Sequence, residues 1–581
     1  MISVLLNWIY IFITSYIIGS FAYRRLIVFA KYSQNRASVN KLFYEMMAGL
    51  ALLTAYSQYF SLVSGVGMTA NLLMIGTCMF FLFFHRKEYK EEIKEWMENG
   101  RRGKVKIFLC ILAAFLIALF VSNGNFMYDT GLYHAQSIRW IEEYGAVKGI
   151  ANIHERLGYN SAFFGLSALF SMKWLIGQSL HGVQGFGALF AVSYSLITIY
   201  DNVRERRTLL CASTICSLGP FIYTAIVSKE LISPTTDYMT VYFIMWLVTA
   251  WVRLIEEEEW EIFPYAYLCI VIVFLITLKL SAALLILAVL WPAIQLIKEK
   301  RWKEIVVYMV SGCFLLLPYL WRNYIVSGWL LYPFSSIDLF SVDWKLAKGT
   351  VDGDAMDVKL WARYIYDREL IDQTIFQWFP TWWREQGDFN RNFSMVVFGI
   401  LFLGILTDIS LWIFSRRIAR TKKWFQYAYL KCVFIACFFF WLLSAPMHRY
   451  GFAFIIMVSL LIVGALFDVM QWKRQKLWPL ALSLFAGVLM ARSLLPICKE
   501  TLLMARENLK DNSYWIRQKD YPNPEMDSVK LGEITIYFPK DPGGQSWYYS
   551  FPATNFGENI QYWKARGEGI EDGFCQKMKD E

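Results

Sequence analysis

Apolar blocks of about 20 residues recur along most of the chain, and they constrain its fold more than any other feature. A block of this length crosses the hydrocarbon core of a bilayer as an α-helix. Within lipid, only helices and closed barrels satisfy all their backbone hydrogen bonds, and the sequence lacks the alternating segments of a barrel. Charged residues make up 18% of the chain, against about 25% in a soluble domain. The sequence therefore predicts an all-α polytopic membrane protein and excludes a cytosolic enzyme, a disulfide scaffold and a disordered chain.

The hydropathy pattern predicts about fourteen transmembrane helices in three blocks. Residues 1–122 hold four spans, residues 182–322 hold six and residues 393–497 hold four. The expected limits are 3–22, 43–63, 68–84, 105–122, 182–201, 208–227, 236–254, 262–278, 280–297, 304–322, 393–413, 424–444, 450–468 and 478–497. Three longer segments lie between and after the blocks, at 123–181, 323–392 and 498–581.

Lysine and arginine gather in one alternate set of the short loops, which predicts the orientation in the membrane. This set comprises the loops near residues 24–41, 86–106, 204–207, 298–303, 416–423 and 473–476. The remaining short turns hold little beyond Lys229, Lys279 and Arg449. We therefore place the basic loops in the cytoplasm, and both termini and the three long segments outside. The net charge of +10 then reflects topology, and no nucleic-acid partner is expected.

The C-terminal segment 498–581 has a pattern of its own. The run Ile534–Phe538 favours a β-strand, and Asp541-Pro542-Gly543-Gly544 is a turn signal. We predict a small extracytoplasmic cap of α+β or irregular structure. Cys498 and Cys575 both lie in this segment, and the sequence leaves open whether they form a disulfide.

Ionisable residues are scarce at the middle of the spans and gather at their outer ends. The sharpest example is Asp129, which follows the fourth span directly and precedes His134 by five positions. Asp129 also suits the N-cap of the helix that follows, so capping is the alternative to a chemical role. A second polar cluster comes soon after, at His154, Glu155 and Arg156.

Several short motifs resemble the GT-C superfamily of polytopic membrane glycosyltransferases. They are Phe126–His134 with the apolar segment 160–175, Thr277–Ser281 around Lys279, Arg322–Gly328 followed by Tyr332-Pro333, and Pro446–Tyr450. Together they cover most of residues 105–470, and the likeness is greatest to uncharacterised bacterial multi-pass proteins. Two features depart from that superfamily. Four spans precede the first large loop where one is usual, and Tyr128-Asp129-Thr130 offers one acidic residue where many members have an adjacent pair.

The resemblance implies roles for residues at the outer helix ends. Asp129 would be the catalytic base, and His134 would orient it or touch the acceptor. The other expected substrate-binding residues are Lys279, Arg322, Arg449, His448, Tyr450, His154, Arg156 and Asp237. Lys279, Arg322 and Arg449 would meet the donor phosphate, since arginine in particular suits phosphate oxygens. Asp237 has a structural alternative, because an acidic side chain in the first turn of a helix complements its dipole. The sequence specifies no cofactor and leaves a divalent metal ion open.

The function expected from these features is transfer of a sugar from a polyprenyl-phosphate donor to an envelope glycan, lipid or protein. The site would face the extracytoplasmic side of a bacterial inner membrane, with membrane lipid as a further partner. A polysaccharide polymerase or ligase is one alternative, because such enzymes also combine many spans with a large late outer loop. A lipid-linked oligosaccharide flippase or another transporter is the second. The sequence does not indicate an oligomeric state.

Overall fold

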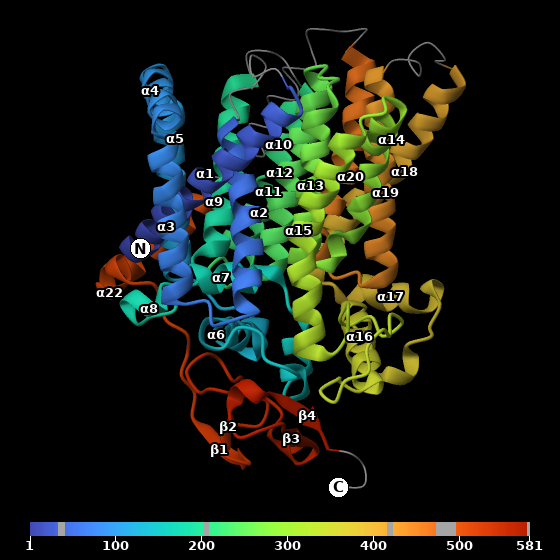
Figure 1. The fold of residues 1–581 in the computed structure, drawn as a ribbon. Helices are drawn as coiled ribbons and strands as arrows, with labels where there is room; N and C mark the ends of the chain where they lie inside the picture. Colours follow the sequence, from blue (N-terminus) through green and yellow to red (C-terminus); the bar gives the residue numbers. More distant parts are fainter. Residues whose placement is uncertain (33–40, 203–207, 415–421, 472–494, 578–581) are drawn as a thin grey trace.

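A computed structural model of the chain describes residues 1–32, 41–202, 208–414, 422–471 and 495–577. Long helices run side by side in one bundle, and the two long segments between the blocks and all described strands gather at one end of it (Figure 1). We call the long segments outer segments, after the orientation expected from the sequence. The N-terminal block contains α1 (Ile2–Phe29), α2 (Lys41–Ser61), α3 (Met68–Phe84), α4 (Arg86–Arg102) and α5 (Lys104–Ser122). The middle block contains α9 (Val183–Asn202), α10 (Thr208–Cys216), α11 (Gly219–Ile222), η5 (Tyr223–Val227), α12 (Thr236–Glu256), α13 (Ile262–Leu278), η6 (Leu280–Val289), α14 (Leu290–Lys298) and α15 (Trp302–Ser327). The last block contains α18 (Gly387–Phe414), α19 (Lys422–Ser444) and α20 (His448–Gln471), and residues 495–510 are also helical.

Helices lie at every predicted span position except the last, 478–497, most of which falls outside the described residues. Eight of the described helices are long and apolar enough to cross a membrane, or nine if the bent pair α3 and α4 is one span. The eight are α1, α5, α9, α12, the continuous stretch Leu280–Lys298, α15, the first 20 residues of α18 and α19. Four shorter apolar helices accompany them, at Ala162–Ile176, Ala212–Val227, Ile262–Leu278 and His448–Ile462. The prediction of a helical membrane protein is thus confirmed at this coarser level.

Helix α12 lies at the centre of the bundle. Every residue from Asp237 to Ile255 is buried, and helices α9, α10, α13, α19 and α20 surround it. At one side of the bundle, α1 and α2 cross closely through two glycines. A Cβ atom on Gly19 would overlap the carbonyl oxygen of Glu45, and one on Gly49 would overlap that of Ser15. Small residues that let helix backbones approach are typical of packing within membranes.

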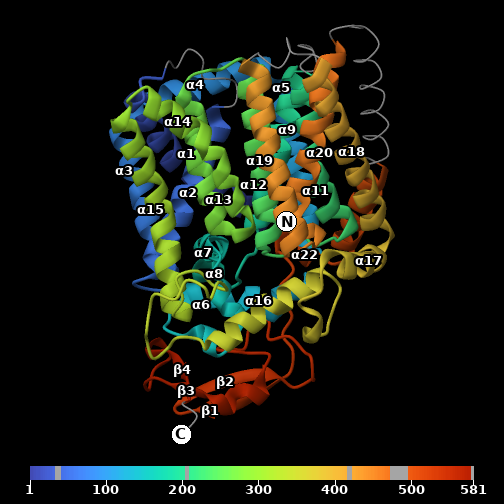
Figure 2. The ribbon, with the colours of Figure 1, turned by 90° about the vertical axis from the view of Figure 1, so that its right-hand side faces the viewer.

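The first outer segment forms η2 (Thr130–His134), α6 (Ala135–Glu143), η3 (Ile150–Asn152), η4 (Glu155–Tyr159), α7 (Ala162–Leu169) and α8 (Lys173–Ile176). The second forms α16 (Lys348–Ala362), η7 (Arg368–Leu370) and α17 (Ile375–Glu385). Viewed from the side, α16 and α17 lie across the end of the bundle and the strands lie beyond them (Figure 2). Two of the three tryptophans of α17 point inward. Trp378 and Trp382 are buried, and Trp382 Nε1 donates to the carbonyl of Pro446 at 2.9 Å.

The C-terminal cap is a small strand-containing segment, as predicted. Strands β1 (Met526–Leu531) and β2 (Ile534–Pro539) form an antiparallel hairpin, in which Leu531 pairs with Ile534. The two-residue turn between them places Gly532 at φ +64°, a conformation that glycine adopts without strain. Strands β3 (Trp563–Ala565) and β4 (Phe574–Gln576) form a second antiparallel pair, and the short helices α22 (Ser513–Ile516), η9 (Gly557–Tyr562) and η10 (Ile570–Asp572) complete the segment. Cys498 and Cys575 do not form a disulfide with each other.

Candidate functional site

The segment that follows α5 is held against the loop that precedes α12. Met127 N donates to Ser233 Oγ at 2.7 Å, and Asn125 N donates to the carbonyl of Lys229 at 2.9 Å. The chain then enters the π-helical turn η2, a geometry that is rare in general and frequent at functional sites. Asp129 occupies the position before this turn, yet its side chain makes no capping hydrogen bond. The capping role considered for Asp129 therefore finds no support, and its carboxylate is directed to other partners.

Asp129 joins a charged cluster built from four distant parts of the chain. Its Oδ2 atom lies 2.9 Å from Nη2 of Arg449, at the start of α20. Nε of the same arginine lies 3.3 Å from Oδ2 of Asp237, in the first turn of α12. Asp237 in turn forms an ion pair with Lys279, which joins α13 to η6. We call Asp129, Asp237, Lys279 and Arg449 the outer cluster.

Tyr450 provides an aromatic wall for this cluster. Lys279 Nζ lies 4.0 Å from the centre of its ring, and Arg449 Cζ lies 5.2 Å from it. Arg449 Nη2 also donates to the Tyr450 hydroxyl at 3.3 Å, and Nη1 reaches Met127 Sδ at 3.5 Å. A cation held over an aromatic face gains electrostatic attraction without a carboxylate partner. Tyr450 therefore supports both cations of the outer cluster at once.

The outer cluster is open enough to be reached. The side chains of Asp129, Arg449 and Lys279 keep 20%, 25% and 20% of their surface exposed, whereas Asp237 keeps 7%. Burial alone would raise the pKa of Asp129, but the positive charges of Arg449, Arg156 and Lys279 hold it below its ordinary value. Burial and the charge of Arg449 lower the pKa of Lys279 well below its usual value, with Asp129 acting in the opposite direction. The site thus holds an ionised carboxylate beside the guanidinium group of Arg449 and the amine of Lys279.

His134 lies near the outer cluster, but within the described structure it makes no hydrogen bond to Asp129. Its ring is buried against Tyr133, at 4.4 Å between ring centres, and Phe164, at 5.3 Å. Burial lowers the pKa of His134 to about 3, although the charge of Asp129 opposes this shift. His134 is therefore neutral at physiological pH, and its Nδ1 atom has no hydrogen-bond partner among the described residues.

Two of the predicted substrate-binding residues, Arg322 and His448, lie apart from the outer cluster. Arg322 is 2% exposed, and it donates to Asn160 Oδ1 at 2.8 Å and to Ser61 Oγ at 2.6 Å. These bonds tie α15 to α2 and to the first outer segment. His448 precedes Arg449 in sequence but faces away from it, because Nε2 lies 2.8 Å from Ser394 Oγ and the ring stacks on Trp382. Both residues have structural partners that account for their burial.

His154 and Arg156 form a separate contact between the two large outer segments. His154 Nδ1 accepts a hydrogen bond from the backbone N–H of Arg156 at 3.1 Å. Arg156 Nε lies 3.3 Å from Asp354 Oδ1 of α16, and its guanidinium carbon lies 4.7 Å from the ring centre of Trp361. Arg156 borders the outer cluster through its charge, which helps to lower the pKa of Asp129. It makes no ion pair with that carboxylate in the described residues.

The C-terminal cap covers the Asp129 turn, and sequence reasoning missed this. Trp547 N donates to the carbonyl of Gly131 at 2.9 Å, and Gln545 Nε2 donates to the carbonyl of Tyr128 at 2.7 Å. A Cβ atom on Gly131 would lie 2.6 Å from Trp547 Cε2, which is too close. The available signal in the sequence was Gly131, within the Asp-Thr-Gly-Leu-Tyr-His stretch. A glycine can indicate that another part of the chain approaches its backbone closely, but it does not indicate which part.

The donor set favours proton transfer and anion binding. Among the described residues, no group of three or more His, Cys, Asp and Glu side chains is placed to hold a metal ion. Each carboxylate of the outer cluster is instead in contact with Arg449, and Asp237 also with Lys279. An arginine and a lysine side by side can bind phosphate oxygens, and a neighbouring carboxylate can accept a proton.

Comparison with known proteins identifies the family. A family model described as "Domain of unknown function (DUF8201)" matches residues 1–456, so the chain belongs to this family. No curated protein and no solved structure matches the chain. All four residues of the outer cluster lie inside the matched stretch, whereas the C-terminal cap lies outside it.

Proposed function

We propose that this DUF8201 member is an integral membrane glycosyltransferase of GT-C type. It would move a sugar from a polyprenyl-phosphate donor to an envelope glycan, lipid or protein acceptor at the outer face of a bacterial inner membrane. The proposal includes about fourteen spans, with the basic loops in the cytoplasm. The observation that carries it is the ion pair between Asp129 and Arg449, which lies beside Lys279 and Asp237 at the end of the bundle that bears the large loops.

The position of the outer cluster suits a lipid-linked donor. Asp129 follows α5, Asp237 begins α12, Lys279 ends α13 and Arg449 begins α20. Each of these residues stands at a helix end, beside an outer segment or a short turn. The ends of membrane-spanning helices lie at the depth of the bilayer headgroups. A polyprenyl chain in the bilayer would therefore carry its phosphate to the depth of Arg449 and Lys279. The acceptor would approach from the outer segments.

The reaction needs one proton acceptor and one stabiliser of phosphate charge. Asp129 takes the proton of the acceptor hydroxyl, whose oxygen forms a bond to the anomeric carbon of the sugar. The bond between that carbon and the phosphate oxygen breaks, and its electron pair leaves with the polyprenyl phosphate. Arg449 and Lys279 stabilise the added negative charge. A single displacement of this kind inverts the anomeric configuration.

Donor binding would also activate the base. In the free protein, Arg449 contributes to the low pKa of Asp129, and a carboxylate of low pKa is a weak base. A donor phosphate competes for the same guanidinium group, because Arg449 can present its fork to phosphate oxygens. Movement of Arg449 toward phosphate would let the pKa of Asp129 rise. The base would therefore gain strength only when a donor is present.

The test is Asp129→Asn, with Asp352→Asn as the matched control. Asparagine keeps the size of the side chain and can accept a hydrogen bond from Arg449, but it cannot take up a proton. We expect sugar transfer to fall roughly 10²–10⁴-fold, the usual worth of a positioned base, at unchanged expression and melting temperature. Asp352 also forms an ion pair on an outer segment, 2.6 Å from Lys348, and its variant should retain full activity.

Glycan analysis of a deletion strain complemented with each variant gives the readout without knowledge of the sugar. Full complementation by Asp129→Asn would remove Asp129 from the mechanism. That result would favour a polymerase, a ligase or a lipid-linked oligosaccharide transporter, none of which requires this carboxylate.

A further inference from the structure

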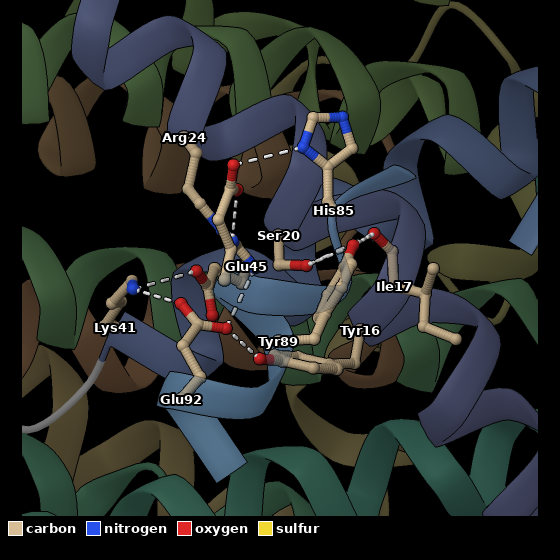
Figure 3. Close-up of polar contacts among 10 residues, drawn as sticks. Tyr16, Ile17, Ser20, Arg24, Lys41, Glu45, His85, Tyr89 and Glu92 are labelled. Atoms are coloured by element: carbon tan, nitrogen blue, oxygen red, sulfur yellow. Dashed lines mark hydrogen bonds and ion pairs between the residues drawn. The ribbon is translucent and has the colours of Figure 1, made fainter. Parts of the chain in front are cut away.

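Helices α1, α2 and α4 enclose a second charged site, at the end of the bundle opposite the strands. It is a cavity of about 380 Å³. Its charged lining comprises Arg24, Arg25, Lys41, Glu88, Glu91 and Glu92. Figure 3 shows the polar contacts that fix its walls. This basic-face cavity shares no residue with the outer cluster.

The walls of the basic-face cavity are firmly built. Glu92 accepts hydrogen bonds from Arg24 Nη2 at 2.9 Å and from Lys41 Nζ at 2.6 Å, and also from the Tyr16 hydroxyl (Figure 3). Tyr89 is 4% exposed and donates its hydroxyl to the carbonyl of Ile17 at 2.9 Å. These bonds join α4 to both α1 and α2. The hydrogen-bonded part of the wall is therefore a fixed feature of the fold, whereas Arg25 and Glu91 are exposed.

Two charged residues of the cavity lining have no ion-pair partner among the described residues. Arg24, Lys41, Glu88 and Glu92 are joined in ion pairs with one another. Arg25, on α1, and Glu91, on α4, form no ion pair within the described residues, although both face the cavity. The guanidinium carbon of Arg25 lies over the ring of Phe21, 5.2 Å from its centre. The cavity thus offers one uncompensated positive and one uncompensated negative group.

The surroundings of this cavity suit the depth of lipid headgroups. Helix α4 is bent by 82° from α3 and lies across the end of the bundle (Figure 2). Its sequence is rich in Lys, Arg and Glu, with apolar residues at 89, 93, 96 and 97, as in a helix that lies in the membrane interface. The last turns of α3 beside it expose Phe80, Phe83 and Phe84 to the exterior. Phe81 of α3 stacks on Phe21 of the cavity wall, at 4.2 Å between ring centres.

We propose that the basic-face cavity binds the headgroup of a zwitterionic phospholipid. The phosphate would contact Arg25, the ammonium group would contact Glu91, and the acyl chains would lie along the phenylalanines of α3. A purely anionic headgroup would satisfy Arg25 but leave Glu91 beside its negative charge. A zwitterion matches both unpaired groups and keeps the cavity neutral. The bound lipid would hold the interfacial helix α4 against the bundle.

The test measures lipid retention by native mass spectrometry of the full chain. Delipidated protein is mixed with phosphatidylethanolamine or with phosphatidylglycerol of the same acyl chains. We expect the parent protein to retain phosphatidylethanolamine, and we expect Arg25→Gln and Glu91→Gln to weaken this retention roughly tenfold or more, the worth of one charged hydrogen bond. Lys90→Gln is the matched control, because Lys90 is an exposed charge of α4 that does not line the cavity. It should bind as the parent does.

Three outcomes would overturn the proposal. Equal retention of phosphatidylglycerol, or displacement of phosphatidylethanolamine by millimolar inorganic phosphate, would make the cavity an anion site. Unchanged retention in Glu91→Gln would exclude contact with the ammonium group. Retention of phosphatidylethanolamine no greater in the parent than in Arg25→Gln would show that the cavity holds no lipid headgroup.

Discussion

The outer cluster and the basic-face cavity lie at opposite ends of one bundle, and both combine cations with carboxylates. They differ in what they leave unsatisfied. In the outer cluster Arg449 contacts both carboxylates and Lys279 contacts Asp237, so every charge has a partner. In the basic-face cavity Arg25 and Glu91 have no ion-pair partner within the described residues. A ligand of the outer cluster must therefore displace an existing contact, whereas a ligand of the cavity only completes one.

This difference suits different tasks. Exchange of partners couples ligand arrival to a change in the pKa of a neighbouring group, as a catalytic base requires. Completion of an unpaired site gives stable occupancy without such a change. The sequence separations agree with this division. The outer cluster draws on residues 129, 237, 279 and 449, whereas the cavity is lined entirely by residues 21–92.

The largest expected effect concerns partner exchange at the outer cluster. Arg449→Ala should weaken binding of a polyprenyl-phosphate sugar by about 1.5–3 kcal/mol, since it removes a charged hydrogen-bond donor to phosphate. Titration of purified protein with the donor measures this change. Arg384→Ala is the control, because Arg384 is 74% exposed on α17 and forms an ion pair with its neighbour Glu385. Equal donor affinity in Arg449→Ala and the parent would contradict the phosphate role.

The next effect tests whether the outer site depends on the cap. Gly131→Ala would push a methyl group into Trp547 and Gln545, and overpacking of this kind costs roughly 1–3 kcal/mol. We expect a lower melting temperature together with reduced sugar transfer. Gly76→Ala in α3 is the matched control, since nothing lies within 4 Å of its added Cβ atom. If both variants behaved alike, the cap would not support the Asp129 turn.

A smaller effect, which depends on pH, is expected where the C-terminal cap meets the first outer segment and not at the basic-face cavity. Burial raises the pKa of Glu142 above its ordinary 4.5, although hydrogen bonds from Tyr548, Ser171 and Ser179 oppose the shift. A raised pKa means that the stabilisation is complete below about pH 4.5 and is lost as the pH rises through the folded-state value. Hydrogen exchange at Trp547 N–H should therefore be slower at pH 5 than at pH 8, after correction for intrinsic rates. Glu142→Gln should abolish that difference, and a difference that persisted would assign it to another group.

The smallest effects lie in the walls of the basic-face cavity. Double-mutant cycles should give a coupling energy of about 0.5–1 kcal/mol for Arg24 with Glu92 and a smaller one for Arg24 with Glu88. The reason is exposure, because the Glu92 side chain is 12% exposed and that of Glu88 is 54% exposed. Thermal unfolding in one detergent provides the measurement. The reverse order of the two couplings would show that burial does not control the strength of these pairs.

The sequence predicted helix positions well because the bilayer imposes one length scale on every apolar block. It also brought together Asp129, Asp237, Lys279, Arg449 and Tyr450, each of which stands at an outer helix end. The sequence did not show that the side chains of Arg449 and His448 have different neighbours. Consecutive residues at a helix start point about 100° apart, so the two side chains face different neighbours. The direction of the Arg322 side chain was hidden for a similar reason, because it depends on where α15 packs against α2.

The sequence did not predict the basic-face cavity, because lysines and arginines in short loops indicate orientation in the membrane and not a binding site. Their pairing with Glu88 and Glu92 depends on the bend between α3 and α4, and no local pattern specifies that bend. Docking of the cap on the Asp129 turn was equally hidden. It joins residues about 400 positions apart, and contacts at such separation follow from the tertiary fold alone.

The complete burial of α12 has a consequence for how the protein is made. Ribosomes deliver the chain from its N-terminus, so α12 enters the membrane before α13, α19 and α20 exist. One side of α12 must therefore face lipid until those helices arrive. Its apolar residues have to satisfy two environments in turn, first acyl chains and later protein side chains. Asp237, at its outer end, meets Lys279 before Arg449, so the outer cluster is assembled in steps and is completed only when α20 is inserted.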